Sequence, residues 1–179
     1  NEELIKKLSE HIKQVLRGMF YSSKESPQTL SLLTHQEKQQ LLIEWNDTKA
    51  DYPDDKTIHQ LFEEQVTKAP NNIAIVYEDQ ELTYQQLNER ANQLAHYLRS
   101  IGVGPDTLVA IAVERSLEMI IGLMGILKAG GAYVPLDPTY PQERLQFMLE
   151  DTQAPILLTQ SSLKEQFKTY SGEVVSLDG

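Results

Sequence analysis

The glycine run from Lys128 to Tyr133 is the first feature of the sequence that could bind a ligand, because glycines let backbone amides approach an anion. Its spacing matches neither the GxxxxGK(S/T) pattern nor the GxGxxG pattern of phosphate-binding loops. The run also follows an expected helix and precedes an expected strand, the reverse of those loops. We therefore interpret Gly130 and Gly131 as a helix C-cap and a tight turn.

Side chains that bind metals are scattered along the sequence. The four histidines lie far apart, and none has a second histidine or a carboxylate pair at metal-ligand spacing: His11, His35, His59 and His96. The chain contains no cysteine, which excludes disulfides, thiolate zinc sites and a cysteine nucleophile. We predict no metal site.

Other reactive side chains have simpler interpretations. An expected buried strand is followed by Glu114, Arg115 and Ser116, at a position where open α/β sheets place ligand groups. We favour a simpler interpretation, in which Ser116 caps a helix and the charged side chains form a solvated or structural ion pair. We interpret four further charged side chains as surface groups: Asp79, Glu81, Glu143 and the neighbouring Arg144. The serines at 161–162 lack the glycines of a nucleophile elbow, so we expect no catalytic serine there.

Composition is that of a folded globular chain. Apolar residues make up 40% and charged residues 23% of the 179 residues. With 26 acidic against 16 basic residues, the formal net charge is −10, which disfavours binding to nucleic acids and anionic lipid surfaces. The longest apolar stretch, Met119 to Leu127, is too short for a membrane span. These features, together with the missing cysteines, favour the cytoplasm.

The first part of the chain alternates helix and linker. Glu2 to Arg17 has apolar residues at helical spacing, and the helix should end near Gly18. The polar segment Tyr21 to Thr29 is typical of a linker. The chain opens without methionine or a signal region, so we expect it to be cut from a longer protein.

Three capping boxes mark the starts of further helices. The helix that begins at Thr34 with Glu37 should end near Asn46, the helix that begins at Thr57 with Gln60 should end at Pro70, and the helix that begins at Thr83 with Gln86 should end near Gly102. Between the second and third of these helices, residues 72–84 are typical of a strand, a turn and a second strand.

From Thr107 onward, strands and helices alternate. The expected elements are strands at Thr107–Val113, Ala132–Pro135, Pro155–Thr159 and Glu173–Leu177, a helix at Leu117–Lys128, a helix from Pro141 to about Asp151, and a short helix capped by Ser162 and Glu165. The fold class is therefore α/β: an N-terminal amphipathic helix and linker, followed by a partial, largely parallel sheet flanked by helices.

The string LKAGGAYVPLDPTYPQERL, from Leu127 to Leu145, resembles the second conserved core motif of adenylation domains in nonribosomal peptide synthetases. LTYQQL, from Leu82, resembles the first core motif. IHQLFEEQV, from Ile58, and the NNIAIVY that follows resemble the start of such a domain. In these motifs we expect Gly130 and Gly131 to make a tight turn, three prolines to stiffen a loop, and Asp137 and Arg144 to form local polar bonds.

LTHQEKQQLLIEWNDT, from Leu33, resembles the linker that joins a condensation domain to an adenylation domain. The resemblance implies three parts: the C-terminal helix of a condensation domain at 1–23, the linker at 24–49, and the incomplete N-terminal portion of an adenylation domain at 50–179.

In that family the complete domain binds ATP, magnesium and an amino acid, forms an aminoacyl adenylate, and passes the acyl group to a carrier protein's phosphopantetheine. The family's phosphate loop, substrate pocket, ribose-binding acidic residue, catalytic lysine and condensation histidine motif have no counterpart in this sequence. No catalytic, cofactor-binding or metal-binding residue is therefore carried over, and we expect this chain alone to be inactive.

Two alternatives stay open. The chain could come from a fatty-acyl-AMP or acyl-CoA ligase, although these are not expected to carry the condensation-like helix and linker. It could also act as an interaction scaffold in which Trp45 anchors a domain junction. The expected partners are the other domains of the same synthetase, and an unpaired sheet edge would favour self-association.

Overall fold

Helices build the first of two units in the chain, residues 1–53. The computed structural model describes residues 2–21 and 30–179. In the first unit α1 spans Glu2–Tyr21, α2 spans His35–Leu42, and the short 3-10 helix η2 spans Glu44–Asn46. Helix α1 continues past its predicted end at Gly18. The linker predicted for residues 21–29 lies, apart from Tyr21, outside the described residues.

Helix α1 contacts the start of α2 through polar groups. The Nε2 atom of His11 lies 2.8 and 2.9 Å from the two carboxylate oxygens of Glu37. The capping box at Thr34 is confirmed, because Glu37 N–H donates to the Thr34 hydroxyl and Thr34 N–H donates to the Glu37 carboxylate. Along α1 the apolar stripe is exposed, between 52% and 66% at Leu4, Leu8, Ile12 and Leu16.

The second unit, residues 54–179, opens with a helix and a hairpin. Helix α3 spans Ile58–Lys68, strands β1 (Ile73–Tyr77) and β2 (Gln80–Thr83) pair antiparallel, and α4 spans Tyr84–Ser100. The capping boxes that start α3 and α4 are both present, as predicted.

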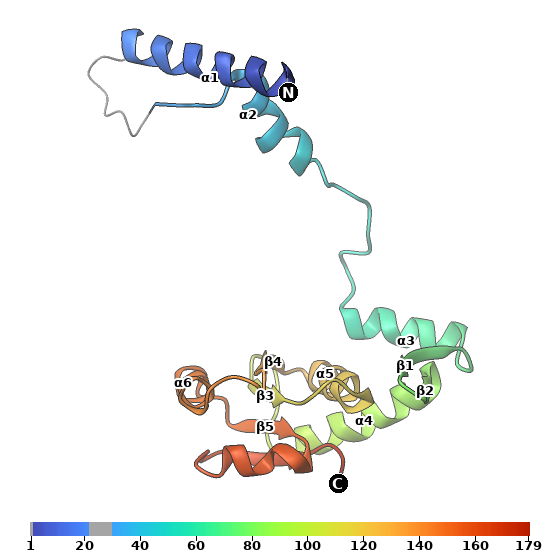
Figure 1. The fold of residues 1–179 in the computed structure, drawn as a ribbon. Coiled ribbons are helices and arrows are strands. Elements are labelled where there is room, and N and C mark those ends of the chain that lie inside the picture. The colour runs from blue at the N-terminus through green and yellow to red at the C-terminus, as the bar shows by residue number, and fades with distance from the viewer. Residues whose placement is uncertain (1, 22–29) are drawn as a thin grey trace. The chain divides into compact units, whose positions relative to one another are not determined.

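A four-stranded parallel sheet follows (Figure 1). Its strands are β3 (Leu108–Ala112), β4 (Ala132–Pro135), β5 (Ile156–Thr159) and β6 (Glu173–Ser176), in the order β4-β3-β5-β6. The helices between them are α5 (Leu117–Ala129), α6 (Gln142–Thr152) and the 3-10 helix η3 (Ser161–Phe167). The predicted α/β fold class is confirmed.

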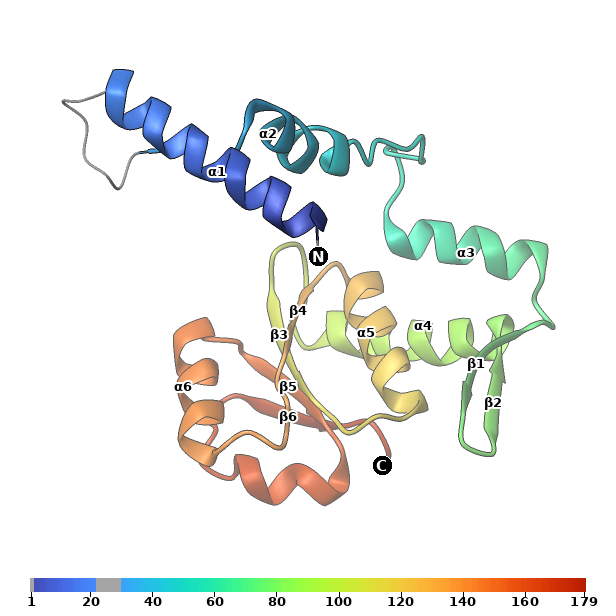
Figure 2. The same cartoon turned by 45° about the horizontal axis from the view of Figure 1, so that its top comes forward.

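Helices lie on both faces of the sheet (Figure 2). Alternating side chains of the buried strands pack against these two helical layers. Val109 and Ile111 of β3 pack in one core with residues of α4 and α5. Ala110 of β3 and Leu157 of β5 pack in a second core with residues of α6 and η3. The sheet is therefore covered on both faces, which explains its continuous apolar runs.

The turn between α5 and β4 has the predicted geometry. Gly130 caps α5 in the left-handed conformation, with φ at 94°. A Cβ atom at Gly131 would lie 2.9 Å from Val103 Cγ1, so only glycine fits without movement of its neighbours. The interpretation of this glycine run as a C-cap and tight turn is confirmed.

Two details of the prediction are wrong. Ser162 and Glu165 do not cap η3, because the helix begins at Ser161 and its N-cap residue, Gln160, makes no side-chain cap bond. Pro141 is the N-cap residue of α6 and does not lie in its first turn.

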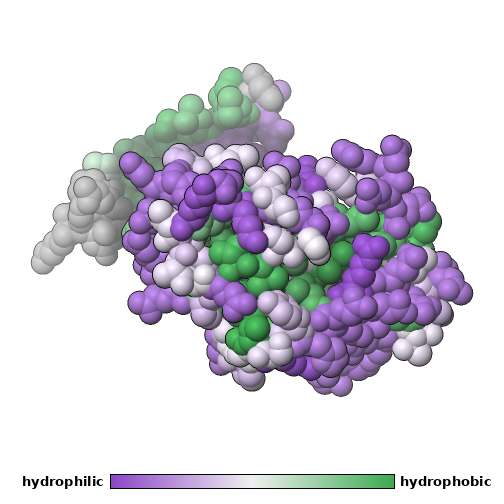
Figure 3. All heavy atoms as spheres, turned by 90° about the horizontal axis from the view of Figure 1, so that it is seen from below, coloured by the Kyte–Doolittle hydropathy of each residue, from purple (hydrophilic) through white to green (hydrophobic). Residues whose placement is uncertain are grey.

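Strands β4 and β6 form the two edges of the sheet. On β6, Val174 and Val175 are only half-buried. Figure 3 shows apolar side chains gathered in the middle of one face of the second unit, surrounded by polar residues.

Candidate functional site

The carboxyl ends of the four parallel strands place one set of loops along a single edge of the sheet. The chain runs from β3 to β4 on one side of β3 and then returns to β5 on its other side. The direction of winding therefore changes between β3 and β5. Open α/β sheets bind ligands in the crevice outside the carboxyl ends at such a point. This edge is the candidate site.

Gln160 bridges the loops that meet at this point. Its side-chain oxygen accepts a hydrogen bond from the backbone N–H of Glu114 at 2.8 Å, and its Nε2 donates to the Ser116 hydroxyl at 3.3 Å. Ser116 in turn caps α5, since its hydroxyl accepts from Met119 N–H at 3.3 Å. The loop after β3 is thus held against the loop after β5, and the predicted helix cap at Ser116 is confirmed.

A second pair of loops is joined by Asp178. One of its carboxylate oxygens accepts from the N–H of Ser161 at 2.8 Å and from the Ser161 hydroxyl at 2.9 Å. The bond from the Ser161 N–H holds the pKa of the Asp178 carboxyl below its usual range. The loops after β5 and β6 are therefore fixed by a charged group, and Ser161 serves here as a hydrogen-bond donor.

At the carboxyl ends of the strands, one more hydrogen bond links two strands, and one buried hydroxyl has no partner in the described part of the chain. Thr159, which is fully buried, donates from its hydroxyl to the carbonyl of Ala112 at 2.8 Å and so ties β5 to β3. Among the described residues, the hydroxyl oxygen of Ser176 is the one buried side-chain nitrogen or oxygen atom that makes no hydrogen bond.

A pocket of about 510 Å³ lies beside this edge, between the loop after β3 and the loop after β4. Its lining is mainly apolar and includes Val113, Met119, Leu123 and Tyr133, with Glu114, Arg115 and Asp137 among its polar residues. Apolar pockets with a few polar groups are typical of small-molecule sites.

The polar residues of the second core motif lie on this side of the sheet. Asp137 accepts from Thr139 N–H at 2.9 Å and from its hydroxyl at 2.7 Å, and these bonds lower the pKa of Asp137. The guanidinium of Arg144 stacks 4.3 Å from the centre of the Tyr140 ring. The local polar bond predicted for Asp137 is present, whereas the contact recorded for Arg144 is a cation–π contact.

The remaining candidates from the sequence are not brought together. His11 contacts Glu37, and His59 lies 3.1 Å from the Thr57 hydroxyl. In the described ranges no group of three or more histidine, aspartate or glutamate side chains is placed to hold a metal ion.

No helix in the part of the chain that the structure describes has the length and apolar character needed to cross a membrane. Trp45 is 66% exposed in the first unit.

Lys128 is a buried residue that the sequence pattern did not single out. The residue is only 5% exposed, and its ammonium donates to the Glu63 carboxylate and to the side-chain oxygen of Asn88, the latter at 2.8 Å. The ammonium also lies 5.7 Å from the Phe62 ring centre, and the backbone carbonyl of Lys128 accepts from Arg99. Lys128 therefore connects α5 to α3 and α4, away from the carboxyl edge.

The sequence profile of the AMP-binding enzyme family matches residues 62–178. The chain belongs to the AMP-binding enzyme family. Bacitracin synthase 3 of Bacillus licheniformis is 48% identical over 179 residues, and gramicidin S synthase 2 of Brevibacillus brevis is 52% identical over 160 residues. These alignments cover 100% and 89% of this chain, but only 3% and 4% of the two relatives.

Solved structures of family members share the fold. The nonribosomal peptide synthetase FmoA3 in its α-methyl-L-serine-AMP-bound form aligns with a TM-score of 0.71 and 32% identity, over 82% of this chain and 16% of FmoA3. An artificially fused adenylation–PCP didomain from Klebsiella oxytoca, NpsA–ThdA, aligns with a TM-score of 0.63 and 24% identity, over 68% of this chain and 23% of the fusion. The resemblance to nonribosomal peptide synthetases that the motifs indicate is confirmed.

Proposed function

We propose that this chain forms the opening, noncatalytic part of an adenylation domain that activates an amino acid as its adenylate in a nonribosomal peptide synthetase. The observation that carries the proposal is the 48% identity to bacitracin synthase 3 over 100% of this chain. In this proposal the carboxyl edge of the sheet, fixed by Gln160 and Asp178, contributes one wall of the ligand site.

In this proposal the glycine turn of the second core motif is not a nucleotide site. The glycine turn cannot hold a phosphate, because Gly130 N–H donates to the Leu127 carbonyl at 3.1 Å and Gly131 N–H donates to the Ile126 carbonyl at 3.0 Å. ATP, magnesium and the carrier-bound phosphopantetheine would therefore be held by other parts of the synthetase, which would also supply the condensation and carrier domains as partners. By itself the chain would be inactive.

The role of the carboxyl edge can be tested in a longer polypeptide that includes the whole predicted adenylation domain. Gln160→Ala removes the bridge between two loops, and small misplacements at a reacting centre are costly, so amino-acid-dependent ATP–pyrophosphate exchange should fall about tenfold or more. Gln93→Ala, on the exposed face of α4, is the matched control and should leave the rate unchanged. Equal rates for the two variants would contradict a role for this edge.

A further inference from the structure

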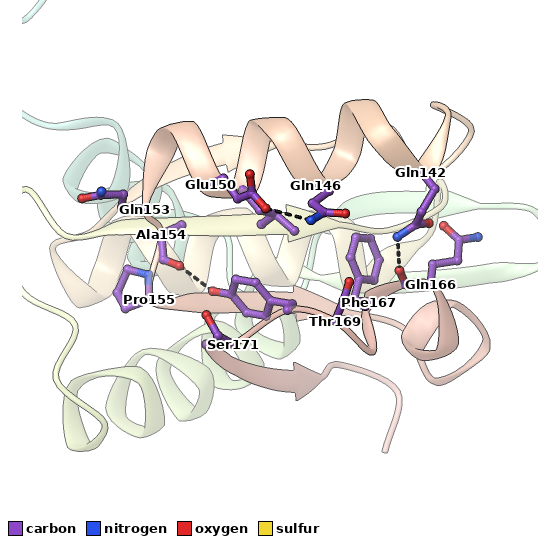
Figure 4. A pocket seen from close by; sticks show the side chains of 13 residues that line it. Gln142, Gln146, Glu150, Gln153, Ala154, Pro155, Gln166, Phe167, Thr169 and Ser171 are labelled. Atoms are coloured by element: carbon purple, nitrogen blue, oxygen red, sulfur yellow. Dashed lines mark hydrogen bonds between the residues drawn. The ribbon is translucent and has the colours of Figure 1, made fainter.

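A second pocket lies at the opposite edge of the sheet, where β5 and β6 begin. Its volume is about 380 Å³, at the lower end of the range for small-ligand pockets, roughly 300–1,000 Å³. One wall is formed by α6 and the other by residues 166–167 and 169–172 (Figure 4). Ala154 and Pro155, which precede β5, complete the lining, so the pocket is separate from the candidate site described above.

Aromatic rings form the base of this pocket. Phe167 is buried, and Tyr170 lines the pocket, with its hydroxyl donating to the carbonyl of Ala154 at 2.5 Å. Burial raises the pKa of the Tyr170 hydroxyl, which therefore stays protonated as a donor. A Cβ atom at Gly172 would lie 2.3 Å from this hydroxyl oxygen, so the close approach of the ring depends on glycine.

The rim is polar and is held in place by side-chain bonds. Gln142 donates from Nε2 to the carbonyl of Gln166 at 2.5 Å and joins the two walls at one end (Figure 4). Gln146 donates to one carboxylate oxygen of Glu150 at 2.8 Å. Among the described residues, Glu150 is the single charged residue in the lining, and its side chain is exposed.

A base of aromatic rings beside one carboxylate is suited to a cation. A planar guanidinium stacks on aromatic rings and pairs with carboxylates through its fixed N–H donors. The amide oxygens of the rim glutamines can accept the remaining donors. None of the described residues that line the pocket is basic and would compete, and the chain's net charge of −10 favours the approach of cations.

We propose that this pocket binds an arginine side chain that a partner protein presents. The guanidinium stacks on the ring of Tyr170 and pairs with the carboxylate of Glu150. A neutral side chain of the same shape would lose the ion pair and bind less well.

Nuclear magnetic resonance titration of the isotope-labelled full chain tests the proposal. The probes are an acetylated and amidated Gly-Arg-Gly peptide and its citrulline counterpart, which keeps the shape but not the charge. Saturable shifts confined to α6 and residues 166–172, with the arginine peptide at least threefold tighter, are expected. Equal affinity for both peptides, or no saturable shift with the arginine peptide, would overturn the proposal.

Variants test the charge assigned to Glu150 and show whether binding needs the Tyr170 hydroxyl. Glu150→Gln should weaken binding of the arginine peptide about three- to fivefold. Asp151→Asn removes the same charge from the neighbouring exposed position outside the lining and should change affinity less than twofold. Tyr170→Phe keeps the ring face and should retain binding, with circular dichroism melting to verify the fold. Equal losses for Glu150→Gln and Asp151→Asn would show a general charge effect and refute the assigned site.

Discussion

At the residue scale, the ammonium of Lys128 is buried, and its hydrogen-bond partners are Glu63 and Asn88. Glu63→Gln removes the charge that faces it, and a hydrogen bond to a charged group contributes more than a neutral one. We expect a loss of about 1–2 kcal/mol in the free energy of unfolding, measured by urea denaturation with circular dichroism.

The matched control for that change is Glu64→Gln on the same helix. Glu64 pairs with Lys56 at 2.6 Å, but both side chains are exposed, at 42% and 37%. Exposed pairs contribute little, so the urea midpoint should be nearly unchanged. Equal shifts for the two variants would contradict the view that burial of Lys128 makes its partner important.

Glu37 makes the first unit sensitive to acid. The hydrogen bond from Thr34 N–H, the contact with His11 and the Thr34 hydroxyl lower the pKa of Glu37 from 4.5 to about 2. Because the folded pKa lies below the unfolded value, this contribution to stability is present above pH 4.5 and is lost as the pH falls through about 2. Carbon NMR of the Glu37 carboxyl should give a midpoint near 2, whereas a midpoint near 4.5 would show that the contact does not persist in solution.

Residues that act across the fold were hard to predict from the sequence. Gln160 bonds to Glu114 and Ser116, which lie 46 and 44 positions earlier, and Asp178 bonds to Ser161, 17 positions earlier. The one available signal was that both follow predicted strands of the parallel sheet, whose carboxyl ends share an edge. Lys128 has a long side chain at a helix end, a pattern more typical of exposed residues.

At the scale of the helices and strands, α4 and α5 pack closely where Gly125 of α5 meets Leu94 of α4. A Cβ atom at Gly125 would lie 2.5 Å from Leu94 Cδ2 and 2.8 Å from its Cγ. Gly125→Ala should therefore destabilise the second unit by about 1–3 kcal/mol, although alanine favours helices. Thermal melting measures the effect.

Gly104→Ala is the control for this packing argument. A Cβ atom at Gly104 would meet nothing within 4 Å, and its φ is not positive. The substitution should leave stability unchanged or raise it by up to about 1 kcal/mol, by restricting the unfolded chain. If Gly125→Ala were equally harmless, the contact between α4 and α5 would be looser than the structure indicates.

Helices and strands with local signals were the predictable part of the fold. The three capping boxes mark the true starts of α2, α3 and α4, because each box acts within one turn. The cap predicted at Ser162 fails because a distant group, Asp178, binds Ser161 and the chain enters a 3-10 helix after Gln160. The strand order likewise depends on contacts that no single segment contains.

At the scale of the whole molecule, we expect the edge strand β6 to favour self-association. Glu173 and Leu177 donate their N–H groups toward β5, to Pro155 and Thr159, so strand alternation turns the N–H of Val174 outward. Val174→Pro removes an outward donor and should lower concentration-dependent association in sedimentation velocity. Val175→Pro instead disrupts pairing with β5 and should lower the melting temperature. Unchanged association in Val174→Pro would exclude this edge as the contact.

Amino-acid-dependent ATP–pyrophosphate exchange tests the proposed function, compared between this chain and a polypeptide extended through the whole predicted adenylation domain. We predict exchange with some amino acid in the extended form and none with this chain alone, because the described residues offer no phosphate-binding amides at the glycine turn. Exchange by this chain alone would contradict the account, since it would require an active site within these 179 residues.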